Sequence, residues 1–357
     1  VGGTAYAQAP PSAGTADAGD GTQATSSQPA PRAPERAAAP LARWVEMQSF
    51  QLNTRYRFIE SSAGVVSSDS VQTAPAIKGR VKVDRGGRLS VHFNATSGGS
   101  FTSGWNNTGL GMGDYDGAFS MKQLYVSVQP MAGVEIHAGG LAPARGQSTE
   151  ITTYDNDGFL TGERVVVKRP RTLWFDEVSL TAGYLGDLST PNVFRRFERM
   201  DDHNYYQALV AKKLPSGVAV SADVTKFDGA WTIRQGAVVS TPALVVVDTV
   251  RVELYQRVEP DTAQGLAVTV DKRISSRLSL GSGFGSIDAA YGGLNGDRFN
   301  RGSRVFATGA VVLSSDFTLS WWLGEGVGND RPISNQRRVD VLLTFNPLKR
   351  LQRARVF

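Results

Sequence analysis

The segment Phe50–Phe58 reads FQLNTRYRF, and its large apolar side chains alternate with polar and charged ones. A β-strand sends successive side chains to opposite faces, so this period of two places one face in apolar surroundings and the other in water. Arg55 and Arg57 both fall on the polar face. The segment therefore predicts a strand that separates an apolar environment from an aqueous one.

The same alternation recurs along the chain as far as residue 345. The apolar members of the further stretches are Ile77, Val81 and Val83; Leu89, Val91 and Phe93; Leu124, Val126 and Val128; Val218, Val220 and Val224; Leu266, Val268 and Val270; Phe317, Leu319, Trp321 and Leu323; and Val339, Val341, Leu343 and Phe345. Two classes of protein show such repetition, the soluble β-sandwich and the membrane barrel.

Charge and aromatic placement favour the membrane barrel. The polar face of the stretches is densely charged, whereas the apolar face is almost free of charge. Trp174 and Tyr184 lie on one face ten residues apart. At a rise of ~3.3 Å and a tilt of ~45° they span roughly 23 Å, close to the ~25 Å between aromatic girdles. We therefore expect an all-β, transmembrane, antiparallel up-and-down β-barrel.

Composition narrows the remaining classes. Of 357 residues, 41% are hydrophobic and 20% charged, yet the longest apolar run, Pro242–Val247, is far shorter than the ~18 residues of a membrane-spanning helix. A closed barrel is the other structure that satisfies every backbone group in lipid. The absence of Cys excludes disulfides, Cys-ligated zinc and thiol nucleophiles. A net charge of +5 without a basic tract argues against nucleic-acid binding.

The connections between stretches alternate between short and long, which allows the strands to be counted. Tight turns are predicted at 85–87, 130–132, 170–171, 215–217, 241–242, 275–276 and 314–316. Long polar connections are predicted at 61–76, 97–118, 142–160, 187–203, 287–302 and 327–335, and shorter ones near 227–229 and 258–264. Threading the chain through them gives about sixteen strands, with short turns in the periplasm and long loops outside. Weak alternation at 161–169, 204–213 and 230–240 leaves fourteen strands as an alternative.

The chain ends differ in composition from this repetitive part. Residues 1–8, VGGTAYAQ, resemble the end of a secretory signal, and residues 9–40 are too poor in large apolar side chains to fold. We expect a signal remnant and a disordered, Ala/Pro-rich periplasmic tail over 1–43, a barrel over 44–346 and a C-terminal extension over 347–357. Phe345 is expected to close the last strand, and the extension with Arg353 and Arg355 makes a poor strand.

Sixteen strands leave an aqueous channel, so inward-facing side chains should line a pore. A basic cluster on the first three strands comprises Arg55, Arg57, Lys78, Arg80, Lys82 and Arg88. An acidic group assigned to the third long loop comprises Glu150, Asp155, Asp157 and Glu163. His92 and His137 are also expected to face the lumen.

In the order and type of these elements the chain resembles the general bacterial outer-membrane porins. The resemblance implies passive diffusion of small hydrophilic solutes through a channel narrowed by the third loop, whose acids face the basic wall. It also implies a homotrimer in outer-membrane lipid and lipopolysaccharide, with the second loop, Ser97–Ala118 including Trp105, reaching a neighbour. The excess of inward basic residues favours a mild preference for anions.

Two other functions stay open at this point. A plugged barrel could serve as a scaffold or adhesion platform and dock partners through its tail and its C-terminal end. Asp201, Asp202 and His203 resemble the Asp-His pair of outer-membrane rim proteases, although those enzymes close a ten-strand barrel in a shorter chain. Asp155, Asp157 and Glu163 are interpreted as solvated acids rather than a calcium site. We expect no catalytic residues, metal or cofactor.

Overall fold

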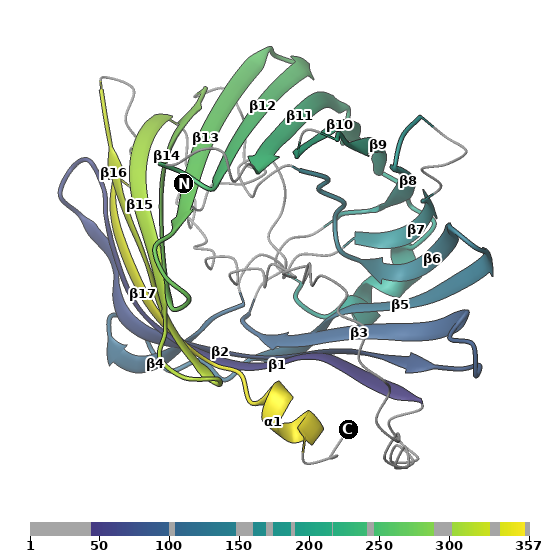
Figure 1. Cartoon of the computed structure of the whole chain (residues 1–357), viewed down its shortest axis with the longest axis horizontal. Helices are drawn as coiled ribbons and strands as arrows, with labels where there is room; N and C mark the ends of the chain where they lie inside the picture. Colours follow the sequence, from purple (N-terminus) through teal and green to yellow (C-terminus); the bar gives the residue numbers. More distant parts are fainter. Residues whose placement is uncertain are drawn as a thin grey trace, which may run out of the picture.

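The strands form one antiparallel sheet that closes on itself. The structure is a computed structural model and describes residues 44–99, 104–147, 160–168, 174–186, 190–215, 217–240, 246–288, 302–328 and 336–353. Strand β1 pairs with β2 on one side and with β17 on the other, which closes the ring seen down its axis in Figure 1. In the described part of the chain sixteen strands form this ring, and β4 is an additional strand paired with β2. The predicted sixteen-strand barrel is confirmed.

The elements have the following bounds: β1 (Val45–Glu60), β2 (Val66–Lys82), β3 (Leu89–Ser97), β4 (Asn106–Gly111), β5 (Phe119–Met131), β6 (Val134–Leu141), β7 (Leu160–Val167), β8 (Glu177–Tyr184), the 3-10 helix η2 (Val193–Arg199), β9 (Tyr205–Lys213), β10 (Val218–Phe227), β11 (Ala230–Ser240), β12 (Thr249–Glu259), β13 (Ala263–Arg273), β14 (Leu278–Ile287), β15 (Gly302–Val312), β16 (Phe317–Gly326), β17 (Arg337–Phe345) and α1 (Leu348–Arg353). We call the end of the barrel where β2 meets β3 the turn rim, and the end where β6 meets β7 the loop rim.

The burial of the side chains is inverted relative to a water-soluble protein. On β17, Val341 and Leu343 are exposed, whereas Arg338 and Asp340 on the opposite face are buried; Leu343 is 39% exposed and Asp340 only 1%. Soluble proteins bury aliphatic side chains and expose charged ones. An apolar outer face around a polar interior is the arrangement of a barrel whose wall meets lipid. This inversion removes the soluble β-sandwich from consideration.

The strands with weak alternation are present, as β7, β9 and β11. Asp176 precedes β8 at the turn rim, on the face expected to be apolar. Its Oδ1 lies 3.3 Å from Lys212 Nζ, and its Oδ2 accepts a 2.6 Å hydrogen bond from the backbone N–H of Lys213. The charge is therefore paired where the wall reaches the aqueous rim.

The first connection is much shorter than predicted. The long loop expected over 61–76 is wrong, because β2 already begins at Val66 and pairs with β1 down to Val81. The small polar side chains of 67–73 show no apolar face, since a strand that extends beyond the lipid meets water on both sides. Backbone pairing with β1 continues without that signal.

Two further predicted connections also need correction. The connection 97–118 contains β4, which pairs with the part of β2 beyond the end of β3. The tight turn predicted at 241–242 lies outside the described residues, and β12 begins only at Thr249, so this connection is longer than two residues.

Part of the C-terminal extension is helical. Helix α1 follows β17 and lies beside β1 at the edge of the ring (Figure 1). Arg350 forms an ion pair with Asp316, a buried carboxylate in the turn between β15 and β16. The extension is thus attached to the turn rim through one charge pair. No helix among the described residues is long and apolar enough to cross a membrane.

Candidate functional site

The candidate site is the inner wall of the barrel. Inward positions follow from the alternation: on β1 the exposed Leu52 and Tyr56 point outward, so Arg55 and Arg57 point inward, where both are buried. Their register neighbours Gln72 and Asp340 share that face. Both arginines therefore lie on the inner face of the barrel.

An arginine–aspartate cluster is centred on Asp340. Arg57 Nε donates to Asp340 Oδ1 over 2.7 Å, and Arg338 Nε donates to Oδ2 over 2.7 Å. Arg55 Nε donates to Gln72 Oε1 over 2.7 Å on the other side of β1. Guanidinium groups around one carboxylate keep every member charged and fix the fork geometry of each arginine. The cluster is therefore rigid and basic.

Two tryptophans pack against these arginines. The guanidinium carbon of Arg55 lies 3.9 Å from the ring centroid of Trp105, and Trp322 lies below Arg338 and Arg304 at 5.1 and 5.6 Å. Such contacts hold a cation by the negative face of an aromatic ring. Arg304, Arg338 and Trp322 were not among the residues predicted to line the pore. Their inward positions in the period of two were the available signal.

The remaining basic residues of the predicted cluster lie towards the turn rim. Lys78, Arg80 and Lys82 occupy alternate inward positions of β2. Arg80 Nη2 and Lys82 Nζ lie 2.8 and 3.3 Å from Glu46 Oε2. Arg88 is exposed in the turn that precedes β3, so it belongs to the rim and not to a strand.

A ladder of rings crosses β3, β5 and β6 on the inner wall. His92 stacks on Tyr125 with centroids 4.6 Å apart, and Tyr125 lies 5.3 Å from His137. His137 Nε2 lies 3.3 Å from Glu135 Oε2. Residues that are opposite each other on adjacent strands lie on the same face of the sheet. The register therefore places His92, Tyr125 and His137 together on the inner face.

The connection between β6 and β7 enters the barrel. Its first residues, 142–147, run along the inner faces of several strands, where side chains bind its backbone. The contacts are Arg164 Nη2 to Ala142 O (2.6 Å), Gln207 Nε2 to Ala144 O (3.0 Å), Arg234 Nη2 to Ala144 O (3.5 Å) and Gln147 N to Ser221 Oγ (2.7 Å). Residues from β7, β9, β10 and β11 therefore hold this segment inside the lumen.

The side chains that bind this segment are themselves fixed. Arg234 forms a buried two-point ion pair with Asp223, with Nε to Oδ1 at 2.7 Å. Gln207 Nε2 also donates to Asp223 Oδ2 over 3.1 Å. A charged pair that is buried and fully bonded resists rearrangement, because breaking it leaves a charge without compensation. The segment is thus held by a rigid support.

The predicted acidic group is divided by the structure. Glu150, Asp155 and Asp157 lie outside the described residues. Glu163 lies in β7, not in the loop, and it shares the outward face with Val165. Its Oε2 lies 3.3 Å from Nε2 of His203. Assigning Glu163 to a constriction loop was wrong, because alternation does not show where a strand begins.

The described part of the second loop contacts its own barrel. Trp105 packs against Ala74 and Leu342 on the inner wall, and β4 pairs with β2. Gln72 Nε2 donates to Asn107 Oδ1 over 2.7 Å. Trp105 is only 6% exposed and packs within its own barrel, so the predicted contact of the second loop with a neighbour would have to use other residues of that loop.

The connection between β8 and β9 covers the outer face at the loop rim. Helix η2 contacts β5, β6 and β7, and the guanidinium of Arg199 lies 4.7 Å from the ring of outward-facing Tyr184. Arg199 also bonds Asp202, and this charge pair raises the pKa of the arginine. With Asp202 bound to Arg199 and His203 beside Glu163, the geometry does not assemble the Asp-His pair of a rim protease. Within the described ranges no three His, Asp or Glu side chains are grouped to hold a metal ion.

The sequence matches no family model and no curated protein. Solved structures do resemble the fold. OmpF of Salmonella typhi, in a complex with daunomycin, has a TM-score of 0.56 at 10% identity, covering 87% of this chain and 100% of that one. OmpT, an outer membrane protein of Vibrio cholerae in trimer form, gives 0.51 at 11%, covering 85% and 98%. A mutant of the Rh. blastica porin gives 0.51 at 11%, covering 84% and 99%. These likenesses establish a barrel of the kind found in bacterial outer-membrane porins.

Proposed function

We propose that the chain forms a water-filled channel in a bacterial outer membrane, for passive diffusion of small hydrophilic solutes with a mild preference for anions. The observation that carries this proposal is the inverted burial around a closed sixteen-strand wall. A barrel of this size encloses more space than its inward side chains fill.

The inward segment 142–147 supports a channel that is narrowed rather than freely open. It lies against β7, β9, β10 and β11, whereas the basic residues of β1, β15 and β17 lie on other strands of the ring. Fixed charges in a narrow wet passage favour small polar solutes over apolar ones. Glu150, Asp155 and Asp157, in the continuation of this segment, would provide an opposing acidic side.

The preference for anions rests on the arginines of the inner wall. Arg55, Arg57, Arg304 and Arg338 lie near one another around Asp340 and Trp322. A basic passage lowers the free energy of an entering anion and raises that of a cation. A homotrimer is a further part of the proposal, supported by the trimer form named for the Vibrio cholerae protein.

Current through a planar lipid bilayer tests the proposal. We expect stable conductance steps after insertion of the detergent-purified chain, a reversal potential in a KCl gradient that indicates anion preference, and steps in groups of three. A folded barrel that never conducts would contradict the channel. Reversal towards cations would contradict the anion preference alone.

A plugged scaffold is a second candidate because of one observation. Tyr255, Ile287, Phe306 and Trp322 face the lumen from β12 to β16, and all four are buried. An apolar cluster of this kind suits a filled interior better than a wet one. The same recordings separate the two functions, since a plugged barrel inserts into the bilayer without conducting.

A further inference from the structure

Three glutamines interrupt the apolar outer face of the barrel. Gln235 lies at the centre of β11, while Gln256 on β12 and Gln264 on β13 lie nearer the loop rim. All three are exposed, and they share the outward face with Ile233, Leu254 and Leu266. At ~3.3 Å per residue and ~45° tilt, Gln235 lies roughly 12 Å below the end of its strand.

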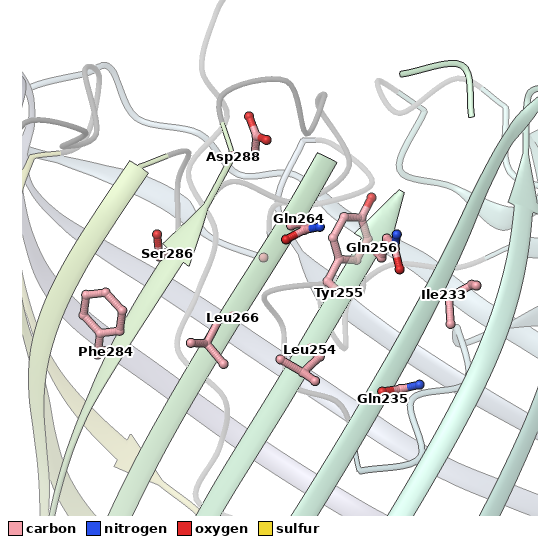
Figure 2. Close-up of a pocket in the computed structure, with 11 residues that line it drawn as sticks. Ile233, Gln235, Leu254, Tyr255, Gln256, Gln264, Leu266, Phe284, Ser286 and Asp288 are labelled. Atoms are coloured by element: carbon pink, nitrogen blue, oxygen red, sulfur yellow. The ribbon is translucent and has the colours of Figure 1, made fainter. Parts of the chain in front are cut away.

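The register brings the three amides together. Gln256 and Gln264 are directly opposite each other on neighbouring strands, and Gln235 is opposite Leu254, two residues below Gln256. They border a hollow of about 970 Å³ on the outer wall. Figure 2 shows Gln256 and Gln264 at the same height, with Leu254 and Leu266 below them and Gln235 to one side.

Gln235, at the centre of its strand, needs a hydrogen-bond partner in lipid, and Gln256 and Gln264 lie above it towards the loop rim. Within the described residues, no side chain or backbone group makes a hydrogen bond to the amide of Gln235, Gln256 or Gln264. A polar group in hydrocarbon without a hydrogen bond costs about 1–3 kcal/mol or more. A molecule that fills the hollow and supplies donors and acceptors would remove this cost.

The chemistry of the lining limits what that molecule can be. Leu254, Leu266 and Phe284 form its apolar part, which suits an acyl chain. Among the described residues that line the hollow there is no Lys or Arg, and Asp288 lies at its upper edge. A phosphate headgroup would meet a carboxylate and no cation, so a headgroup of hydroxyls or amides without charge fits better.

We infer that this outer-face hollow binds a lipid whose uncharged headgroup, rich in hydroxyl or amide groups, is hydrogen-bonded by Gln235, Gln256 and Gln264. The apolar tail lies along Leu254, Leu266 and Phe284. The inference rests on the membrane placement in the proposed function but not on conduction. Measurements of lipid binding test this inference, whereas measurements of current through a bilayer test the proposed channel.

The test uses native mass spectrometry of the full chain in detergent with two probes of identical acyl chains, a diglucosyl diacylglycerol and phosphatidylglycerol. We expect the glycolipid to be retained preferentially. Replacing the three amides through Gln235→Leu, Gln256→Leu and Gln264→Leu should weaken its binding about tenfold or more, as loss of a few hydrogen bonds predicts. The control Thr54→Val, on the outward face of β1, should leave binding unchanged.

A second variant keeps the test decisive if the triple variant folds poorly. Gln256→Lys with Gln264→Lys should reverse the preference towards phosphatidylglycerol. Equal retention of both lipids by the natural chain would overturn the inference, and so would undiminished glycolipid binding by the triple variant. An oligomer that dissociates with Gln235→Leu would also overturn it, since a second copy of the chain would then occupy this face.

Discussion

At the scale of single residues, the face on which a side chain lies decides its energetic role. Asp340 is buried between Arg57 and Arg338. Arg337, which precedes Arg338 in the chain, lies at the loop rim and pairs with Glu60 and Glu325 at the surface. A buried ion pair cannot lose one partner without leaving a charge uncompensated. An exposed pair is replaced by water at little cost.

Asp340→Asn should therefore both destabilise the barrel and shift its selectivity. We expect a loss of about 3 kcal/mol or more in the free energy of unfolding, against less than about 1 kcal/mol for the control Arg337→Gln. Urea unfolding followed by tryptophan fluorescence measures both. The reversal potential in a KCl gradient should move further towards anions. Equal stability of the two variants would contradict the buried cluster.

At the scale of elements, the segment 142–147 depends on strands that are far from it in the chain. Gln207 on β9 donates one hydrogen bond to Ala144 O and another to Asp223. Gln207→Ala removes about 1 kcal/mol of net support from the segment. We expect larger and more variable single-channel conductance, with Gln48→Ala, an exposed position at the turn rim, as the matched control. Unchanged conductance in both variants would show that this segment does not limit the passage.

Two aspartates tie neighbouring strands together in the same way at the turn rim. Asp176 precedes β8 and binds Lys212 and the N–H of Lys213, at the end of β9. Asp248 precedes β12; it lies 2.8 Å from Lys272 Nζ and accepts a 2.7 Å hydrogen bond from the N–H of Arg273, at the end of β13. The backbone N–H of Lys213 chiefly lowers the pKa of Asp176, and Lys272 chiefly lowers that of Asp248, both from an ordinary 3.8.

A lowered carboxylate pKa means that each clamp stabilises the fold above pH 3.8 and loses this contribution as the pH falls through its folded value. The double variant Asp176→Asn with Asp248→Asn should therefore have a lower urea midpoint at pH 7. Its deficit relative to the natural chain should shrink below pH 3.8. The exposed loop variant Asp114→Asn should match the natural chain throughout. A deficit that does not change with pH would contradict ionised clamps.

The strands were predictable from the sequence because a period of two is local, and the inward face of Arg55 or His92 follows from it directly. The pairing of those residues is not local: Arg57 and Asp340 meet although 283 positions separate them, and only the closed register joins β1 to β17. The contacts of the loops with the inner wall could not be predicted from the sequence for the same reason. Trp105 and the segment 142–147 bind inner-wall groups that no spacing in the sequence indicates.

At the scale of the whole molecule, the two rims differ in construction. Most connections at the turn rim are short, except those that precede β8 and β12. This rim also carries the clamps of Asp176 and Asp248 and the α1 attachment. The loop rim has the extended β1–β2 hairpin with β4 beside it, and the η2 segment folded over the outer wall. A barrel inserted from the periplasm carries its longer connections through the membrane to the outside. The asymmetry therefore predicts one orientation.

Orientation can be measured cleanly because the chain contains no Cys. Tyr115→Cys places a thiol at the loop rim, where Tyr115 is 76% exposed, and Ser276→Cys places one in the exposed turn between β13 and β14 at the turn rim. With a maleimide that cannot cross membranes, intact cells should label the Tyr115→Cys variant alone. The Ser276→Cys variant should react only after the outer membrane is permeabilised, because the lipid wall separates the two rims. The opposite labelling would place the loop rim in the periplasm. Labelling of neither variant in intact cells would contradict the proposed location in the outer membrane.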